Sequence, residues 1–254
     1  MELGDLTMKT VERRIVVVGH RGASGYEPEN TFASFDLAVE QGADMLELDV
    51  HLTKDGVPVV IHDDTLQRTT GATGKVREKS LAQIRTLNAA TNNPNHPFEP
   101  VPTLEEVAEK YHNDVGLMVE IKYGSSFYKN IEEKVVSILE KSNAIGNCEI
   151  ISFDFDCVRK VKSIRRDIPT GIIFIGRIPD FTPLAEEIGC SALHPSYEYV
   201  SMEDVLQTRK TANLHVYTWT IDDPEDIRYQ CEVIKPDGIV TDYPDVALRE
   251  ARRL

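Results

Sequence analysis

The sequence predicts an α/β protein folded as a (β/α)8 TIM barrel. Short runs rich in Val and Ile alternate with stretches of helical composition along most of the 254 residues, and eight such runs remain once one hairpin strand is set aside. Runs of this kind, ended by polar residues or Gly, are typical of strands that are buried on both faces. About 250 residues is the usual size of such a barrel, so one domain over residues 1–254 is expected.

The predicted elements follow the order that a barrel requires. Strands are predicted at 15–19, 44–50, 115–121, 149–152, 170–175, 191–193, 214–220 and 238–241. Helices are predicted at 31–41, 128–141, 154–166, 183–188, 202–211 and 224–230. The interval between the second and third of these strands is much longer than the others and needs its own explanation.

A hairpin begins this long interval. Asp55-Gly56 lies between two apolar runs, which is a strong hairpin pattern. A turn this short joins only antiparallel strands, so Val57–Ile61 is expected to be an extra strand outside the eight. If the turn has two residues, Lys54 pairs with Val57, and the register places His62 opposite Asp49 on the same face. Residues 63–101 are then expected to form a small capping insertion over one rim, with a short helix near 81–87.

Composition excludes several classes of protein. The longest apolar run, Ile15–Gly19, is far shorter than the roughly 20 residues of a membrane span. The first residues lack the basic and apolar regions of a secretory signal, so a cytoplasmic protein is expected. A net charge of −14 argues against nucleic-acid binding, which depends on neutralising phosphates. A small phosphorylated substrate needs only a local positive site and stays possible. The four cysteines are scattered and are expected to be packing thiols.

Polar residues gather at the carboxyl ends of the first three predicted barrel strands, where barrel enzymes place their active sites. His20-Arg21 follows the first strand. Glu47 and Asp49 lie two apart on the second strand and therefore point to one face, and Glu120 and Lys122 repeat this arrangement on the third. Three carboxylates and a lysine on inward faces are hard to explain by packing.

Glu47, Asp49 and Glu120 form an all-oxygen set that suits a hard divalent cation, Ca²⁺ or Mg²⁺. Without a metal these carboxylates would repel one another. The alternative is that they are ion-paired to Lys122 and Arg21 and are structural. His20 and His62 are the natural proton-transfer pair, because histidine titrates near neutrality.

Three further positions lie near late strands. Trp219 either packs in the core or forms an apolar wall of the substrate pocket, and we place it among the substrate-binding candidates. His194, at a strand end, could also line the site. Thr241-Asp242 follows the last strand, where a structural role is favoured over a role at the rim.

These residues, in this order, resemble the glycerophosphodiester phosphodiesterase family. The similarity extends over nearly the whole chain from about residue 15, and the combination of motifs is far more specific than any one of them. The motifs that carry it are His20-Arg21-Gly22, Pro28-Glu29-Asn30-Thr31, Glu47-Leu48-Asp49-Val50, Thr53-Lys54-Asp55-Gly56, Val60-Ile61-His62-Asp63, Leu66, Arg68-Thr69-Thr70, Gly74-Lys75-Val76, Pro102-Thr103-Leu104-Glu105-Glu106, Glu120-Ile121-Lys122, Trp219-Thr220, Asp237-Gly238 and Thr241-Asp242.

The resemblance implies a barrel like that of the phosphatidylinositol-specific phospholipases C, with residues 63–101 as the capping subdomain. It implies divalent-metal-dependent hydrolysis of small-molecule glycerophosphodiesters to an alcohol and sn-glycerol 3-phosphate. By position, the metal ligands would be Glu47, Asp49 and Glu120, the acid–base pair His20 and His62, and the phosphate-binding residues Arg21 and Lys122.

Two other functions compete with this one. A lysophospholipase D type activity on acylated glycerophosphodiesters would need an apolar groove or a membrane-facing surface, and the sequence shows no amphipathic or transmembrane anchor. A non-catalytic family member would bind glycerophosphodiesters or a partner without turnover, but the complete set of polar site residues favours a hydrolase. The head group, the identity of the metal, the choice between water and the glycerol 2-hydroxyl as nucleophile, and the oligomeric state stay open.

Overall fold

The computed structural model describes residues 14–178, 181–212 and 214–252. Residues 1–13, to which the expectation about a secretory signal applies, lie outside this part of the chain. Within the described ranges, no helix has the length and apolar character that crossing a bilayer requires.

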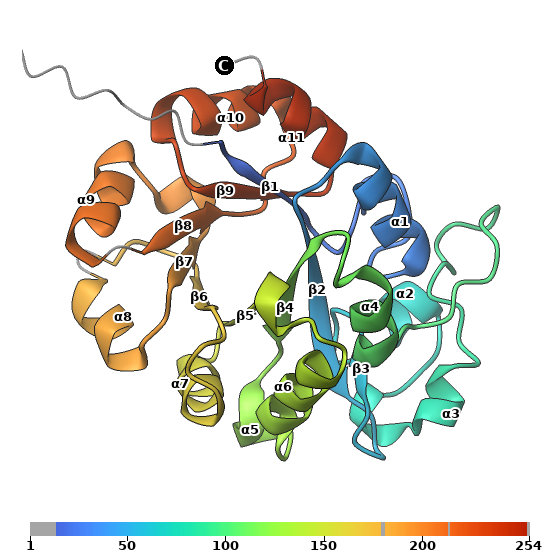
Figure 1. Cartoon of the computed structure of the whole chain (residues 1–254). Coiled ribbons are helices and arrows are strands. Elements are labelled where there is room, and N and C mark those ends of the chain that lie inside the picture. The colour runs from blue at the N-terminus through green and yellow to red at the C-terminus, as the bar shows by residue number, and fades with distance from the viewer. Residues whose placement is uncertain (1–13, 179–180, 213, 253–254) are drawn as a thin grey trace, which may run out of the picture.

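A closed barrel of parallel strands forms the centre of the molecule, as predicted (Figure 1). In the described residues eight strands take the order β1-β9-β8-β7-β6-β5-β4-β2, and pairing of β1 with β2 closes the ring. Their bounds are β1 Val16–Gly19, β2 Met45–Leu52, β4 Gly116–Ile121, β5 Cys148–Ser152, β6 Thr170–Phe174, β7 Ala192–Pro195, β8 His215–Thr218 and β9 Gly238–Thr241.

Helices surround the barrel, one after each strand (Figure 1). They are α1 Phe32–Gln41, α4 Leu104–Tyr111, α6 Ile131–Lys141, α7 Phe155–Ile164, α8 Thr182–Ile188, α9 Met202–Ala212, α10 Pro224–Tyr229 and α11 Pro244–Ala251. Shorter segments are α5 Gly124–Phe127, the 3₁₀ turns Ile145–Asn147 and Tyr197–Tyr199, and the π-helical turn Gln230–Ile234. Helix α4 is absent from the predicted set, although its Thr103 and Glu106 form a capping box that marks a helix start.

Two apolar layers hold the barrel together. One lies between the strands and the helices and includes the fully buried Phe35, Leu46 and Leu117. The other fills the barrel interior, from Val18, Met118, Ile151, Ile173 and Val240. The polar residues at the strand ends therefore lie directly above an apolar layer, where charges are weakly screened.

The insertion after the second barrel strand has a small core of its own. Its elements are β3 Pro58–Val60, α2 Gln67–Thr70, the 3₁₀ turn Val76–Glu78 and α3 Leu81–Ile84. Its core side chains are Val59, Ile61, Leu66, Val76, Ile84, Ala89 and Val101. Figure 1 shows this unit beside α1 and α4, outside the ring of strands.

The predicted extra antiparallel strand is present, but its predicted register is wrong by one residue. Val50 pairs with Val60, so Ile61 lies opposite Asp49, and the Ile61 amide donates to the Asp49 carbonyl at 3.0 Å. The turn has three residues, 54–56, and closes on Thr53 and Val57, because of its residues only Gly56 has positive φ, 77°, whereas a two-residue type I′ turn would need positive φ at Asp55 as well. His62 therefore does not reach the site by cross-strand pairing. It lies beyond the end of β3 and enters the site from there.

Candidate active site

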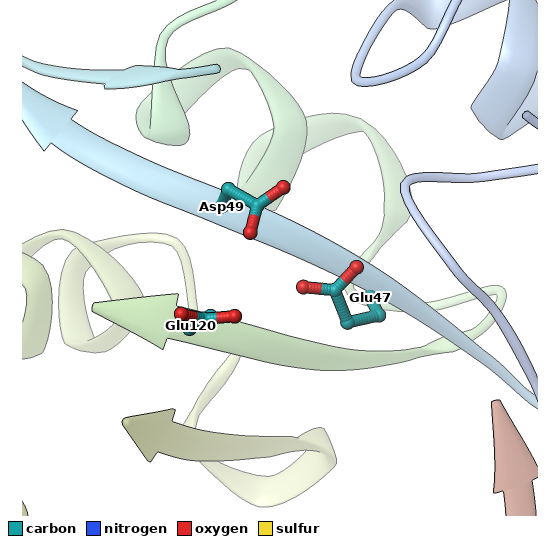
Figure 2. Close-up of side chains that lie close together, drawn as sticks. All are labelled: Glu47, Asp49 and Glu120. Carbon is teal, nitrogen blue, oxygen red and sulfur yellow. The ribbon is translucent and has the colours of Figure 1, made fainter. Parts of the chain in front are cut away.

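The strands β2 and β4 bring three carboxylates together inside the barrel mouth (Figure 2). Glu47 and Asp49 come from β2, and Glu120 lies on β4 directly beside Asp49 in the register. All three are buried, with exposed fractions of 3%, 1% and 7%. Each offers an oxygen atom, and these three oxygens lie within 4.8 Å of one another. The alternation of side chains along both strands thus places them as the sequence predicts.

The pKa values of Glu47, Asp49 and Glu120, here called the acidic trio, are shifted in different directions. Burial raises the pKa of Glu47 well above its ordinary value, and the charges of Asp49 and Glu120 raise it further. The pKa of Glu120 is also raised, chiefly by burial. Burial acts in the same direction on Asp49, but Lys122 and Arg21 outweigh it and hold the pKa of Asp49 far below its ordinary value. Glu47 is therefore the member least compensated by positive charge.

Two positively charged side chains, Lys122 and Arg21, contact the acidic trio. Lys122 Nζ is 2.8 Å from Asp49 Oδ1 and 2.6 Å from Glu120 Oε1. Arg21 Nε is 3.4 Å from Asp49 Oδ2, and among the described residues no group accepts a hydrogen bond from this buried nitrogen. The carboxylates are thus ion-paired to Lys122 and Arg21, as the alternative to a metal site expects. This pairing still leaves the Nε donor of Arg21 without an acceptor among the described residues.

A tight turn after β1 sets the direction of Arg21. Arg21 and Gly22 both have positive φ, 56° and 87°. A Cβ atom on Gly22 would lie 2.5 Å from Ser34 Oγ, so only Gly fits this close approach to α1. The Ser34 hydroxyl donates to the Arg21 carbonyl at 2.8 Å, and the Arg21 amide donates to Glu47 Oε2 at 3.0 Å. The turn therefore fastens this end of β1 to the acidic trio.

Each of the two predicted catalytic histidines has a carboxylate on Nδ1. His20 Nδ1 is 2.6 Å from Asp242 Oδ1, and His62 Nδ1 is 2.8 Å from Asp63 Oδ1. A carboxylate there favours the tautomer that carries its proton on Nδ1 and leaves Nε2 for a substrate. Burial lowers the pKa of His62, and hydrogen bonds, first from Arg68, lower the pKa of Asp63 to about 2.

These groups surround a cavity of about 150 Å³. Its lining consists of His20, Arg21, Glu47, His62, Met118, Glu120, Lys122, Ile151, Phe153, Ile173, His194, Trp219 and Val240. A more open cleft of about 350 Å³ shares His62, Glu120, Lys122 and Phe153 with it and extends past Asp63 and Tyr123. One side of the site is therefore charged and the other is apolar.

Trp219 lies on the apolar side of the cavity. Its indole nitrogen donates to the carbonyl of His194 at 2.7 Å, and its ring meets Phe153 edge to face with centroids 5.6 Å apart. His194 lines the cavity as well, and its Nε2 is 3.2 Å from the buried carboxylate of Glu149. Of the two predictions for Trp219, the structure places the indole in the pocket wall.

Sequence reasoning missed the partners of the catalytic candidates. Asp242 is the partner of His20, so it lies at the rim of the site, the alternative that the sequence did not favour. Its position directly after the last barrel strand was the pattern that could have identified it. Glu29 and Arg68 were recognised only as motif residues, but Glu29 accepts from Arg21 Nη1 at 2.9 Å and Arg68 binds both Glu29 and Asp63.

A (β/α)8 barrel whose mouth holds an acidic trio, two carboxylate-oriented histidines and two cations has the groups that hydrolysis of a phosphate diester requires. The family model described as the glycerophosphoryl diester phosphodiesterase family matches residues 20–246. The chain belongs to this family and is a phosphoric diester hydrolase.

Individual relatives agree over almost their whole lengths. YhdW of Bacillus subtilis is 37% identical over 243 residues, which cover 93% of this chain and 98% of that protein. The glycerophosphodiester phosphodiesterase of Caldanaerobacter subterraneus is 35% identical, over 94% of this chain and 99% of its own. Among solved structures, an Oleispira antarctica phosphodiesterase in complex with the product sn-glycerol-3-phosphate superposes with a TM-score of 0.82 and 26% identity, covering 93% of this chain and 96% of that one.

Proposed function

We propose that this enzyme hydrolyses glycerophosphodiesters to an alcohol and sn-glycerol 3-phosphate with the help of a divalent cation. The observation that carries the proposal is that both histidines, Arg21, Lys122 and two members of the acidic trio line one cavity, with the third member, Asp49, directly beside them. Buried charges are costly unless they are paired or bind a metal, and groups with strongly perturbed pKa values in a cavity are typical of functional sites. The product bound to the Oleispira relative supports the choice of substrate class.

The acidic trio fits Ca²⁺ or Mg²⁺ as the cation. All its donors are carboxylate oxygens, the ligands that hard cations prefer. Glu47 is buried beside two other carboxylates, and its pKa is raised first by burial and then by their charges, so a bound cation would stabilise its ionised form. When bound by Glu47, Asp49 and Glu120, the cation would supply Lewis-acid stabilisation of the charge on the phosphate oxygens.

Arg21 and Lys122 are the proposed phosphate grip. The buried Nε of Arg21 is a donor at the cavity with no acceptor among the described residues, as an anion site needs. Lys122 lines both the cavity and the open cleft, so it can reach a phosphate at their junction. Lys122→Ala, assayed at saturating metal, should lower kcat/KM by about 10² to 10³-fold. Recovery of wild-type efficiency under that condition would show that Lys122 only offsets the carboxylates.

The two histidines have different surroundings, which assigns their roles. His20 lines the inner cavity only, whereas His62 lines both the cavity and the open cleft through which an alcohol can leave. We assign to His62, in its doubly protonated form with Nδ1–H held by Asp63, the donation of the Nε2 proton to the leaving alcohol. His20, held by Asp242, takes the proton of the nucleophile.

A second candidate substrate is an acylated glycerophosphodiester, as in a lysophospholipase D type activity. Phe153 follows the end of β5, is 47% exposed and meets the Trp219 ring. Both side chains line the cavity and offer an apolar surface at the site. This apolar surface favours an acylated substrate as the second candidate, and the two carboxylate-oriented histidines argue against a non-catalytic binding role.

The test measures release of glycerol 3-phosphate and, for the lysophospholipid lysophosphatidylcholine, release of choline. Glycerophosphocholine, glycerophosphoethanolamine, glycerophosphoglycerol, glycerophosphoinositol and a lysophospholipid are incubated with the enzyme, each with chelator, Ca²⁺ or Mg²⁺. We expect glycerol 3-phosphate to be released from the unacylated esters. Chelator should abolish this release, and either Ca²⁺ or Mg²⁺ should restore it. Full activity after dialysis against chelator would contradict the metal requirement, and choline release from the lysophospholipid alone would favour the second candidate.

A further inference from the structure

Arg68, in helix α2 of the insertion, holds two carboxylates at once. Its Nη1 and Nη2 donate to Glu29 at 2.5 and 2.8 Å. Its Nε and Nη2 donate to Asp63 at 2.8 and 3.1 Å. A planar guanidinium presents its N–H groups along two edges and can satisfy two carboxylates in this way, whereas an ammonium group is a point charge.

Each of these carboxylates also holds a residue of the active site. Glu29 Oε1 accepts a hydrogen bond from Arg21 Nη1 at 2.9 Å. Asp63 Oδ1 lies 2.8 Å from His62 Nδ1. Arg68 is therefore at the centre of a hydrogen-bonded network that connects Arg21, of the proposed phosphate grip, with His62, the proposed proton donor.

The insertion fixes Arg68 in place. Leu66 is fully buried in the core of the insertion, and its carbonyl accepts from the Thr70 hydroxyl at 2.6 Å. The Asn92 side chain, from a distant part of the same insertion, donates to the Arg68 carbonyl at 2.7 Å. The backbone that carries the guanidinium is thus anchored on both sides of the helix.

We propose that Arg68 is a positioning residue that orients His62 and Arg21 together, so that the insertion couples proton transfer to phosphate binding. This inference rests on the roles proposed above for those two residues. Ion pairing through Arg68 keeps Asp63 ionised, in agreement with its lowered pKa, so Asp63 always accepts the Nδ1 proton of His62. Loss of Arg68 frees both carboxylates to turn away from the residues that they hold.

The matched control is Arg85, in the same insertion. Arg85 also binds one carboxylate through two bonds, to Glu106 at 2.7 and 2.9 Å, but it does not line the cavity or the cleft. Arg68→Met should lower kcat and raise KM, with a combined loss in kcat/KM of about 10- to 100-fold, the usual effect of a residue that orients catalytic groups. Arg85→Met should change the melting temperature by a similar amount and leave both kinetic constants near wild type.

Two more variants complete the experiment. Arg68→Lys keeps the positive charge but cannot donate to both carboxylates with the geometry of a guanidinium, so it should also lose activity. If Arg68→Met does not fold, the kinetic constants of Arg68→Lys decide the question. Asp63→Asn should lower kcat/KM much less in the Arg68→Met background than in the wild type, because the two side chains act as one unit. Kinetic constants for Arg68→Lys and Arg68→Met that match those of Arg85→Met would overturn the inference. His62→Ala and Arg21→Ala, measured in parallel, test the proposed function itself, since near-wild-type activity in both would remove its basis.

Discussion

Replacing Glu47 by Gln should make the protein more stable than the wild type without metal and less stable than the wild type with metal. In the metal-free protein the Glu47 carboxylate is buried 4.8 Å or less from two other carboxylate oxygens. At this distance a pair of like charges costs about 3 kcal/mol for an effective dielectric constant near 20. Lys122, Arg21 and protonation offset part of this repulsion. We therefore expect Glu47→Gln to raise the free energy of unfolding by about 1 to 2 kcal/mol in chelator.

With Ca²⁺ or Mg²⁺ present, the order should invert. A cation at 100 times its dissociation constant stabilises the folded wild type by about 2.7 kcal/mol. Gln lacks the charge of the lost ligand, so Glu47→Gln should gain little from the same concentration. The wild type then becomes the more stable protein.

The assay is urea unfolding of both proteins in excess chelator and in saturating metal. Glu105→Gln serves as control, because Glu105 is exposed in the first turn of α4 and should show no metal-dependent difference. A lower stability of Glu47→Gln in chelator, or an unchanged order after metal addition, would refute the view that the trio holds repulsion that a cation relieves.

Three further predictions concern neighbouring features of the site. His20→Ala and His62→Ala should each lower kcat by about 10² to 10⁴-fold, and the double variant should lose much less than the product. Asp63 has a folded pKa of about 2, below its ordinary 3.8, so its stabilisation is present above pH 4 and is lost as the pH falls toward 2. Asp63→Asn should flatten the stability curve in this window by about 1 to 2 kcal/mol, as measured by urea unfolding. Gly22→Ala should destabilise by about 1 to 3 kcal/mol in thermal unfolding, because of its positive φ and the Ser34 contact, whereas Gly146→Ala, with open space around it, should not.

The barrel could be predicted because its strands leave a local pattern. Val- and Ile-rich runs identify each strand, and the two-residue alternation of Glu47 and Asp49 places both side chains inside the barrel. The hairpin register could not be predicted, because Asp55-Gly56 suits a turn of two residues as well as one of three. The conformation of Asp55 decides between them, because a two-residue type I′ turn needs positive φ at both Asp55 and Gly56, and only Gly56 has it.

The partners of the histidines were beyond the reach of local patterns. His20 and Asp242 are 222 residues apart and meet only because β1 pairs with β9. Arg68 is 39 residues from Glu29, and no periodicity links the insertion to the loop after β1. Such contacts follow from the closure of the barrel and the docking of the insertion, so they become visible only in three dimensions.

The strand that carries Glu47 and Asp49 is held on both sides. Along one edge β2 pairs with β4 from Met45 to Val50, while its other edge pairs first with β1 and then with β3. The backbone of this strand cannot spread to relax its charges when the cation leaves. The amide hydrogens of β2 should accordingly exchange with deuterated solvent only through global unfolding, so metal should slow them no more than it slows the most protected amides of the other barrel strands, and the site behaves as a rigid socket rather than a clamp that closes around its ion.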